Sequence, residues 1–274
     1  MPSGGLIVRR RRLEPWTQRV WRLLRRARGS FEKRQRVYVV EVGDARLKQI
    51  VLPDACVAGE IAANLEALDA TAIFPRLVAR YRNELWVEFV DGSALARGAT
   101  PSCSEIADVF APIYRCANRI VPLASLTLVE RLASDLELLA SARVLSAEDR
   151  ARLAAALPAV TPAQLWLGYD YGDARAQNFL RGADGRLRII DVESIRRDSP
   201  VGVGVVRALI RWPGMDRDEL LAELKKRSAP EFDSYLGFLE LLFLTTWTKR
   251  CVLQGKSARR GSEILARIAL HSPK

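Results

Sequence analysis

Histidine is nearly absent from this sequence, whose 274 residues include only His271. This scarcity argues against a catalytic triad that uses histidine and against a metal site with several histidines. The four cysteines, at positions 56, 103, 116 and 251, lie far apart and form no C-x-x-C pair, which argues against a zinc site. No signal peptide is visible, so we expect a cytoplasmic protein with free thiols.

Long apolar runs are also missing. The most apolar stretch, residues 236–247, contains Glu240 and is shorter than the ~20 residues that cross a bilayer. We therefore expect a buried helix there. Aromatic residues make up only 7% of the chain and no nucleic-acid-binding motif is evident, so nucleic acid is the least favoured partner.

Positive charge is concentrated at the start of the chain. Residues 1–36 hold twelve Lys and Arg and two acidic residues, whereas the remainder is nearly neutral. Residues 1–12 are expected to be a loose tail. Within residues 14–28, an apolar stripe with helical spacing is flanked by arginines and predicts an amphipathic helix. Such a helix fits two roles, docking on the protein body or binding an anionic membrane surface.

The pattern of apolar residues predicts an α+β protein with two lobes. Strands are expected at residues 36–42, 46–52, 73–80 and 84–90, with a helix that begins at Asp54 and runs to residue 68. Helices are expected at about 102–119, 124–142, 146–157, 200–212, 216–227, 231–254 and 258–270. A strand-and-loop region occupies about 165–191. The predicted division is a basic tail and helix at 1–28, a small β-rich lobe at 29–92 and a larger helical lobe at 93–274.

One stretch carries residues suited to catalysis. Residues 167–194 read LGYDYGDARAQNFLRGADGRLRIIDVES, in which Asn178 follows Asp173 by five residues and Asp191 ends an apolar strand after a turn. Asn178 and Asp191 offer the hard oxygen ligands that Mg²⁺ prefers. Asp173 would then accept a proton from an attacking hydroxyl. Each residue alone has a structural alternative, as a turn or capping residue.

This stretch resembles the catalytic core of the protein-kinase-like superfamily. It is most similar to the aminoglycoside-phosphotransferase and lipopolysaccharide-kinase branches, whose loop reads approximately H-G-D-x4-N before an I-D-x-E/D strand end. The resemblance implies a two-lobed kinase-like fold. It assigns Asp173 as the catalytic base, Asn178 and Asp191 as metal ligands, Glu193 as a second acid near the metal, and Arg175 as the cation that stabilises the transferring phosphoryl group.

The first lobe is similar to the same superfamily. Lys48 lies in the second predicted strand and Glu60 in the following helix, as in the kinase pair that contacts the α- and β-phosphates. Residues 84–92, ELWVEFVDG, resemble the hinge that meets adenine. The resemblance therefore places ATP against the backbone of three residues, Glu88, Phe89 and Val90.

Two departures from the family pattern keep a second function open. Tyr171 stands where the family's loop has histidine, and no clear glycine-rich phosphate loop precedes residue 36. The first interpretation is an ATP- and Mg²⁺-dependent phosphotransferase that acts on a hydroxyl of a small molecule, or of a glycolipid such as a lipopolysaccharide sugar at the inner face of the membrane. The second is an inactive pseudokinase or nucleotide-binding scaffold.

Overall fold

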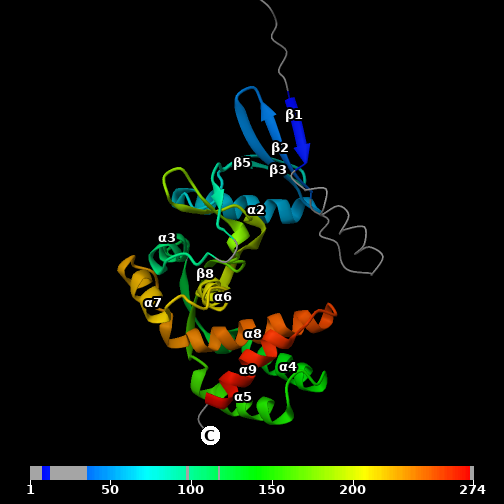
Figure 1. Cartoon of the computed structure of the whole chain (residues 1–274), viewed down its shortest axis with the longest axis vertical. Coiled ribbons are helices and arrows are strands. Elements are labelled where there is room, and N and C mark those ends of the chain that lie inside the picture. Colours follow the sequence, from blue (N-terminus) through cyan, green and yellow to red (C-terminus); the bar gives the residue numbers. More distant parts are fainter. Residues whose placement is uncertain (1–7, 13–35, 97–98, 117, 272–274) are drawn as a thin grey trace, which may run out of the picture. The chain divides into compact units, whose positions relative to one another are not determined.

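The structure is a computed structural model and describes residues 8–12, 36–96, 99–116 and 118–271. The chain divides into two compact units (Figure 1). Unit 1 comprises the described residues of 1–99 and 175–195, and unit 2 those of 100–174 and 196–274. Residues 175–195 thus belong to unit 1, whereas the predicted division placed them in the helical lobe.

Unit 1 is built on an antiparallel sheet with the strand order β1-β2-β3-β5-β4. Its strands are β1 (Val8–Arg12), β2 (Arg36–Val42), β3 (Ala45–Val51), β4 (Leu77–Tyr81) and β5 (Glu84–Glu88). Helix α2 (Ala55–Leu68) packs against β4 and β5. It begins as the sequence predicts, because the Asp54 carboxylate accepts a 2.8 Å hydrogen bond from the N–H of Val57.

Two expectations for unit 1 are corrected. Residues 8–12 are not a loose tail but strand β1, in which Val8 lies opposite Val42 on β2. A run of arginines does not predict a strand. Residues 8–12 become a strand because they pair with the edge of β2. Strand β4 begins at Leu77 rather than at residue 73, because the Ile73 carbonyl instead accepts a 2.8 Å hydrogen bond from the N–H of Ile189.

A second, small sheet completes unit 1, with the strand order β10-β9-β6. Its strands are β6 (Ser93–Ala94), β9 (Phe179–Arg181) and β10 (Leu187–Ile189). Strands β9 and β10 form the predicted hairpin, whose turn includes Gly185 with φ +77°. Three short 3₁₀ segments also belong to this unit, Asp69–Thr71, Ala176–Asn178 and Val192–Ser194.

Unit 2 is mainly helical. Its helices are α3 (Cys103–Tyr114), α4 (Leu128–Ser141), α5 (Ala147–Val160), α6 (Val203–Arg211), α7 (Arg217–Lys226), α8 (Leu236–Leu253) and α9 (Arg259–His271). Aromatic side chains fill the core beside α3, where the Tyr114 ring packs edge-on against Phe232 at 5.5 Å. Helix α8 contains the apolar stretch predicted to be buried, and most of its residues from Leu236 to Leu244 are buried.

A short sheet runs through unit 2 in the order β11-β8-β7. Its strands are β7 (Arg119–Pro122), β8 (Gln164–Tyr171) and β11 (Ile195–Pro200). The sequence predicts that the first helix of this unit reaches residue 119, but α3 ends at Tyr114 and β7 follows. Strands β7 and β11 are too short to show a pattern of their own, and both form by pairing with β8.

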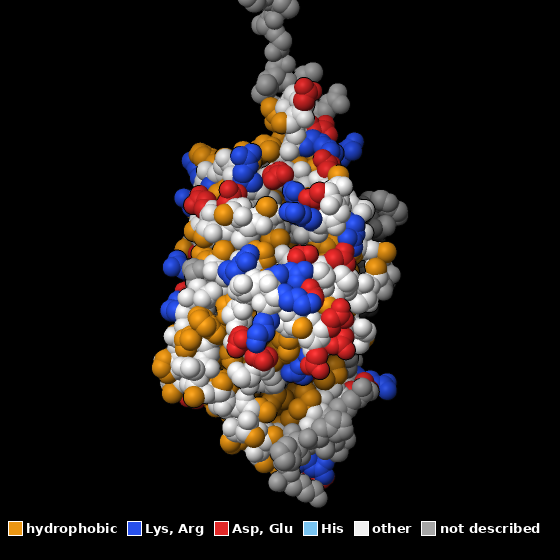
Figure 2. All heavy atoms as spheres, turned by 90° about the vertical axis from the view of Figure 1, so that its left-hand side faces the viewer, with side chains coloured by type: hydrophobic (Ala, Val, Ile, Leu, Met, Phe, Trp, Pro, Cys, Tyr) orange, Lys and Arg blue, Asp and Glu red, His pale blue; other side chains and the backbone are white. Residues whose placement is uncertain are grey.

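The distribution of charge on the surface agrees with the nearly neutral composition of the chain after residue 36. On the face shown in Figure 2, basic and acidic side chains are interspersed rather than gathered by sign. Among the residues that the structure describes, no helix is both long and apolar enough to span a membrane. The amphipathic helix predicted at 14–28 lies outside those residues.

Candidate active site

Lys48 lies on β3, between β2 and β5 in the sheet of unit 1. Its Nζ donates a 2.6 Å hydrogen bond to the carbonyl oxygen of Ile190. Burial lowers the pKa of Lys48, while the nearby carboxylates of Asp191 and Glu193 act in the opposite direction. A partly desolvated lysine beside acids would gain favourable interactions from a phosphate ligand.

Asn178 and Asp191 come together because the β9–β10 hairpin closes between them. The N–H of Ile190 donates a 3.0 Å hydrogen bond to the backbone oxygen of Asn178, which brings the start and end of the hairpin side by side. The Asn178 side chain is buried, and its Nδ2 donates to Asp191 Oδ2 at 3.4 Å. The structure therefore brings Asn178 and Asp191 together, while their role as metal ligands stays a prediction.

The donor set of this corner fits Mg²⁺. Asn178 supplies an amide oxygen and Asp191 a carboxylate, and Mg²⁺ is usually held by one or two carboxylates together with substrate phosphates and water. Within the described residues, no group of three or more His, Cys, Asp and Glu side chains could hold a metal. In the usual arrangement of such a site, substrate phosphates and water complete the coordination of the metal.

Glu60 does not occupy the position that the kinase resemblance predicts. The buried residues of α2 include Ile61, Leu65 and Leu68, and helical periodicity places Glu60 outside that face. Glu60 is exposed and forms no ion pair with Lys48. The acids that act on Lys48 are Asp191 and Glu193, which belong to the segment after the hairpin.

The predicted adenine hinge follows β5. The N–H of Glu88 donates a 2.9 Å hydrogen bond to the Arg76 carbonyl, and the Glu88 carboxylate lies 3.8 Å from the guanidinium of Arg188. Phe89 is half-buried with the guanidinium of Arg46 4.7 Å above its ring, and Val90 is buried. The structure thus places these three residues at the end of the sheet, and their contact with ATP stays a prediction.

The predicted catalytic base, Asp173, belongs to unit 2 and follows β8. Arg207 of α6 binds it, with Nη2 2.6 Å from Asp173 Oδ1. The same guanidinium donates a 2.7 Å hydrogen bond from Nη1 to the Gly172 carbonyl, and it lies 5.5 Å from the centre of the Phe243 ring. Three contacts on one side chain hold Arg207 in place, so the Asp173 carboxylate has a defined orientation.

Sequence reasoning missed Arg207. The signal that could have found it is its place on α6, where an arginine falls among apolar residues in the run VGVVRALIR. Arg175, to which the kinase resemblance assigns the stabilisation of the phosphoryl group, is exposed and directly precedes the 3₁₀ segment Ala176–Asn178. Tyr171 is completely buried, which agrees with a packing role at the position where the family has histidine.

Asp170 holds the start of α6, the helix that carries Arg207, close to the segment after β8 that contains Asp173. Its buried carboxylate accepts hydrogen bonds from the N–H groups of Gly202, at 3.0 Å, and Gly204, at 3.1 Å, at the start of α6. Burial raises the pKa of Asp170 to about 7, and the N–H bonds oppose this shift. A carboxylate at a helix N-terminus also interacts favourably with the helix dipole. The end of β8 and the start of α6 are thereby joined.

Gly204 makes this junction possible because the backbones approach closely there. A Cβ atom at this position would lie 2.3 Å from the Phe110 ring and 2.5 Å from the Tyr171 carbonyl oxygen. Arg207 follows one helical turn later, on the side that faces the loop. The segment after β8 therefore packs closely against helix α6. Asp170 and Gly204 join the two elements, and Arg207 binds Asp173.

Solved structures of phosphotransferases share this architecture. A Ralstonia eutropha protein classed as an aminoglycoside phosphotransferase superposes over 99% of this chain and 94% of its own, with a TM-score of 0.64 and 16% identity. The macrolide 2'-phosphotransferase of Brachybacterium faecium covers 93% and 99%, with a TM-score of 0.58 and 13% identity. The chain has a protein-kinase-like fold. The predicted fold class is therefore confirmed.

A choline kinase from Streptococcus pneumoniae is similar to the same extent, with a TM-score of 0.58, 12% identity and coverage of 94% of this chain and 99% of its own. No protein-family model matches the sequence, and no curated protein matches it either. At such low identities, the likeness shows the fold alone. The activity has to be argued from this chain's own residues.

In kinase-like proteins a glycine-rich loop between the first two strands covers the phosphates. Residues 13–35, which link β1 to β2 in the sequence, lie outside the described residues, so the structure does not test whether this chain has such a loop.

Proposed function

We propose that this protein is an ATP- and Mg²⁺-dependent phosphotransferase that moves the γ-phosphate to a hydroxyl group. The observation that carries the proposal is the set of contacts around the β9–β10 hairpin. Lys48 reaches the backbone directly beside Asp191, and Asn178 touches that carboxylate, so a cation for phosphates and two oxygen ligands lie in one corner of unit 1. Unit 2 supplies a carboxylate with a fixed orientation, Asp173.

Each residue has one role in the proposed reaction. Lys48 binds the α- and β-phosphates, and Asn178 and Asp191 hold the metal, which neutralises phosphate charge when bound. Asp173 accepts the proton of the acceptor hydroxyl. The hydroxyl oxygen then forms a bond to the γ-phosphorus, the bond from that phosphorus to the β-phosphate oxygen breaks, and ADP leaves with the bonding electrons. Arg207 keeps the carboxylate of Asp173 oriented during this step.

We consider two kinds of molecule as the acceptor. One is a small hydroxyl compound, in line with the similar structures, which include macrolide and aminoglycoside phosphotransferases and a choline kinase. The other is a glycolipid sugar at the inner face of the membrane. The twelve basic residues of segment 1–36 support that second acceptor, because anionic lipid attracts such a segment.

Thermal unfolding with ATP and Mg²⁺ tests the nucleotide site. Ligand at one hundred times its dissociation constant should stabilise the native protein by about 2.7 kcal/mol. Asp191→Ala should remove this gain. Asp184→Ala is the matched control, because Asp184 lies in the same hairpin turn, where its carboxylate accepts the N–H of Arg186. Equal stabilisation of wild type and Asp191→Ala would refute the assigned metal site.

Phosphotransfer is tested separately with Asp173→Ala. This variant should retain the stabilisation by ATP and Mg²⁺ while losing ADP formation in the presence of an acceptor. The exposed position of Glu60 supports the second candidate, an inactive nucleotide-binding scaffold, because the usual partner of the kinase lysine is missing. Stabilisation by ATP without ADP formation across an acceptor screen would favour that scaffold. Unchanged turnover in Asp173→Ala would refute Asp173 as the base.

A further inference from the structure

The face of the unit 1 sheet that carries Lys48 also carries an arginine of β1. In the antiparallel register, Lys48 of β3 lies opposite Val39 of β2, and Val39 lies opposite Arg11 of β1 (Figure 1). Residues that lie directly opposite each other on neighbouring strands point to the same face of the sheet. Because adjacent strands are about 4.8 Å apart, Arg11 and Lys48 stand about 10 Å apart in one row, with Val39 between them.

Helix α2 covers only part of this face. It packs against β4 and β5, and on β5 the side chains of Leu85 and Val87 are completely buried. On β2, in contrast, Val37 and Val39 are only half-buried, and Arg11 on β1 is exposed. The part of the face between β1 and β3 therefore offers an apolar floor with a cation on each side.

Arg11 differs from the other cations of this face in its partners. Lys48 donates to the Ile190 carbonyl, and Arg46 binds the carboxylate of Asp91. For Arg11, no ion pair is found with any acid among the residues that the structure describes. Glu41, the acid that β2 carries on this face, lies opposite Arg46, in the row next to that of Arg11. The Arg11 guanidinium is therefore available to an anionic ligand.

The sequence before β2 gives this cation a purpose. A glycine-rich loop holds phosphates through backbone N–H groups, which glycine lets approach closely. Residues 13–35 contain a single glycine, Gly29, so they carry no such pattern. Phosphates on the β1 side then need another partner. A guanidinium suits them, because it donates two parallel hydrogen bonds to one phosphate and keeps its charge at every physiological pH.

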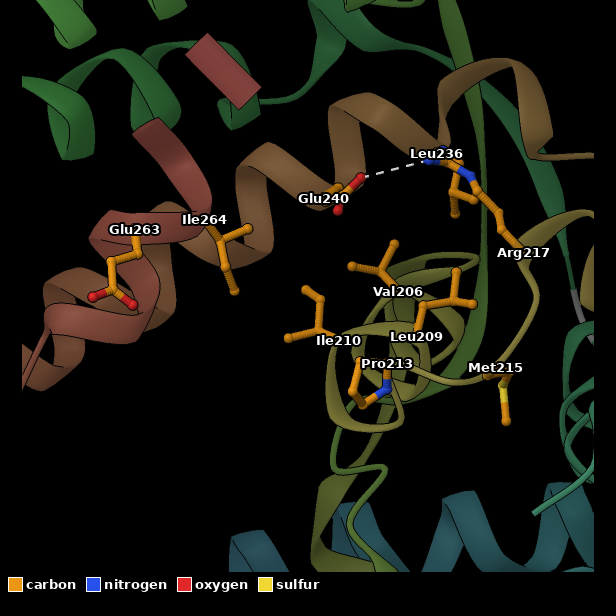
Figure 3. A pocket seen from close by; sticks show the side chains of 10 residues that line it. All are labelled: Val206, Leu209, Ile210, Pro213, Met215, Arg217, Leu236, Glu240, Glu263 and Ile264. Carbon is orange, nitrogen blue, oxygen red and sulfur yellow. Dashed lines mark ion pairs between the residues drawn. The ribbon is translucent and has the colours of Figure 1, made fainter. Parts of the chain in front are cut away.

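The cavity of unit 2 would not bind phosphates. It has a volume of about 700 Å³ and is bordered by α6, α8 and α9 (Figure 3). Most of its wall is apolar, and Glu240, which extends into it, is already paired with Arg217 at 3.7 Å. Together with Glu263, the lining holds two acids and one arginine. Its net negative charge disfavours an anionic ligand.

We propose that Arg11 binds the phosphate chain of the nucleotide from the β1 side, across the sheet from Lys48. This inference deepens the proposed function and rests on it. The phosphate chain lies over Val39, Lys48 donates to it from β3, and the guanidinium of Arg11 donates to its oxygens from β1. In this chain a charged side chain thus takes over a task that backbone N–H groups of a loop perform elsewhere.

Arg10 supplies the matched control. It is the neighbour of Arg11 on the same edge strand, but it points to the other face, where its guanidinium lies 3.7 Å from the centre of the Tyr38 ring. Arg10→Gln and Arg11→Gln remove the same charge from the same strand. They differ in the face of the sheet that loses it.

Calorimetric titration of the full chain with ATP and Mg²⁺ compares the two variants. Arg11→Gln should weaken the binding of ATP and of ADP by about tenfold or more, the usual effect of losing a hydrogen bond from a charged donor. The affinity for adenosine, which has no phosphate, should not change. Arg10→Gln should keep the affinity for ATP within about twofold of wild type. Arg11→Lys retains a cation and should recover part of the loss.

Three results would overturn the assignment of Arg11 while the nucleotide site itself stands. They are an unchanged affinity for ATP in Arg11→Gln, equal losses in Arg10→Gln and Arg11→Gln, and a loss of adenosine affinity in Arg11→Gln that equals the loss of ATP affinity. Failure of the wild type to bind ATP would instead refute the proposed function together with this inference. Because each readout is binding, the result does not depend on turnover.

Discussion

Arg207 binds Asp173 at 2.6 Å and, through the same guanidinium, the carbonyl of the preceding Gly172 at 2.7 Å. The cation therefore fixes both the carboxylate and the backbone that carries it. A general base contributes only if it meets the proton that it removes in the correct geometry. Arg207 acts through Asp173, and we interpret it as a positioning residue of the proposed active site.

Replacement of Arg207 should impair turnover more than nucleotide binding. In Arg207→Ala, the Asp173 carboxylate loses its oriented ion pair, and misplacement of a reacting group by about 1 Å can lower the rate about 100-fold. We expect kcat to fall by roughly that factor while the Kd for ATP, measured by calorimetry, changes little. Arg211→Ala is the control, because Arg211 lies one turn further along α6, over the ring of Trp247 rather than beside Asp173. Equal kcat losses in both variants would contradict the positioning role.

Gly204→Ala should destabilise unit 2 because no space exists for the added methyl group. Its Cβ would lie 2.3 Å from the Phe110 ring and 2.5 Å from the Tyr171 carbonyl, so backbone or ring must move. Overpacking of this kind costs about 1–3 kcal/mol, which urea denaturation would measure. Gly214→Ala is the control, because nothing lies within 4 Å of a Cβ at that position. A loss of stability in Gly214→Ala that equals the loss in Gly204→Ala would contradict the steric explanation.

Asp170 should make the free energy of unfolding depend on pH in a defined direction. Burial raises its folded pKa from the model-compound value of 3.8 to about 7, so the folded state binds this proton more tightly than the unfolded state. The contribution to stability is then fully present below about pH 4 and decreases as the pH rises to about 7. The slope is at most about 1.4 kcal/mol per pH unit.

The comparison with Asp170→Asn isolates this effect. The amide oxygen of Asn can still accept from Gly202 or Gly204, but it does not titrate. The difference in unfolding free energy between wild type and Asp170→Asn should therefore change between pH 4 and pH 7 and level off above pH 7. The Tyr114 hydroxyl, 3.5 Å from Asp170, does not confuse the result, because burial raises the pKa of Tyr114 well above this range. A difference that stays constant with pH would show that Asp170 is ionised throughout.

Glu60 and Lys48 should respond differently to substitution. Glu60→Gln should leave the affinity for ATP within about twofold of wild type, because Glu60 is exposed and makes no ion pair with Lys48. Lys48→Met should weaken it by about tenfold or more, the usual effect of losing a hydrogen bond from a charged donor. Calorimetric titration with ATP and Mg²⁺ measures both. A tenfold loss in Glu60→Gln would show that α2 moves to form the pair when nucleotide binds.

The motif and the elements with regular periodicity could be predicted from the sequence. The spacing of Asp173, Asn178 and Asp191 marks the segment proposed to be catalytic, and the hairpin between the last two residues brings them together. The N-cap at Asp54 and the β-branched residues of β2 are equally local signals, since capping and strand propensity depend on neighbours within a few residues.

The sequence therefore determined the kinase-like order of elements, the hairpin that joins Asn178 to Asp191, and the concentration of positive charge in residues 1–36. Tertiary structure alone decided that β1 pairs with β2, that Glu60 lies outside the buried face of α2, and that Arg207 binds Asp173. These features join segments distant in sequence or depend on which helix face is buried. They are stabilised by burial and by hydrogen bonds between those segments, and these interactions cannot be predicted from a local pattern of residues.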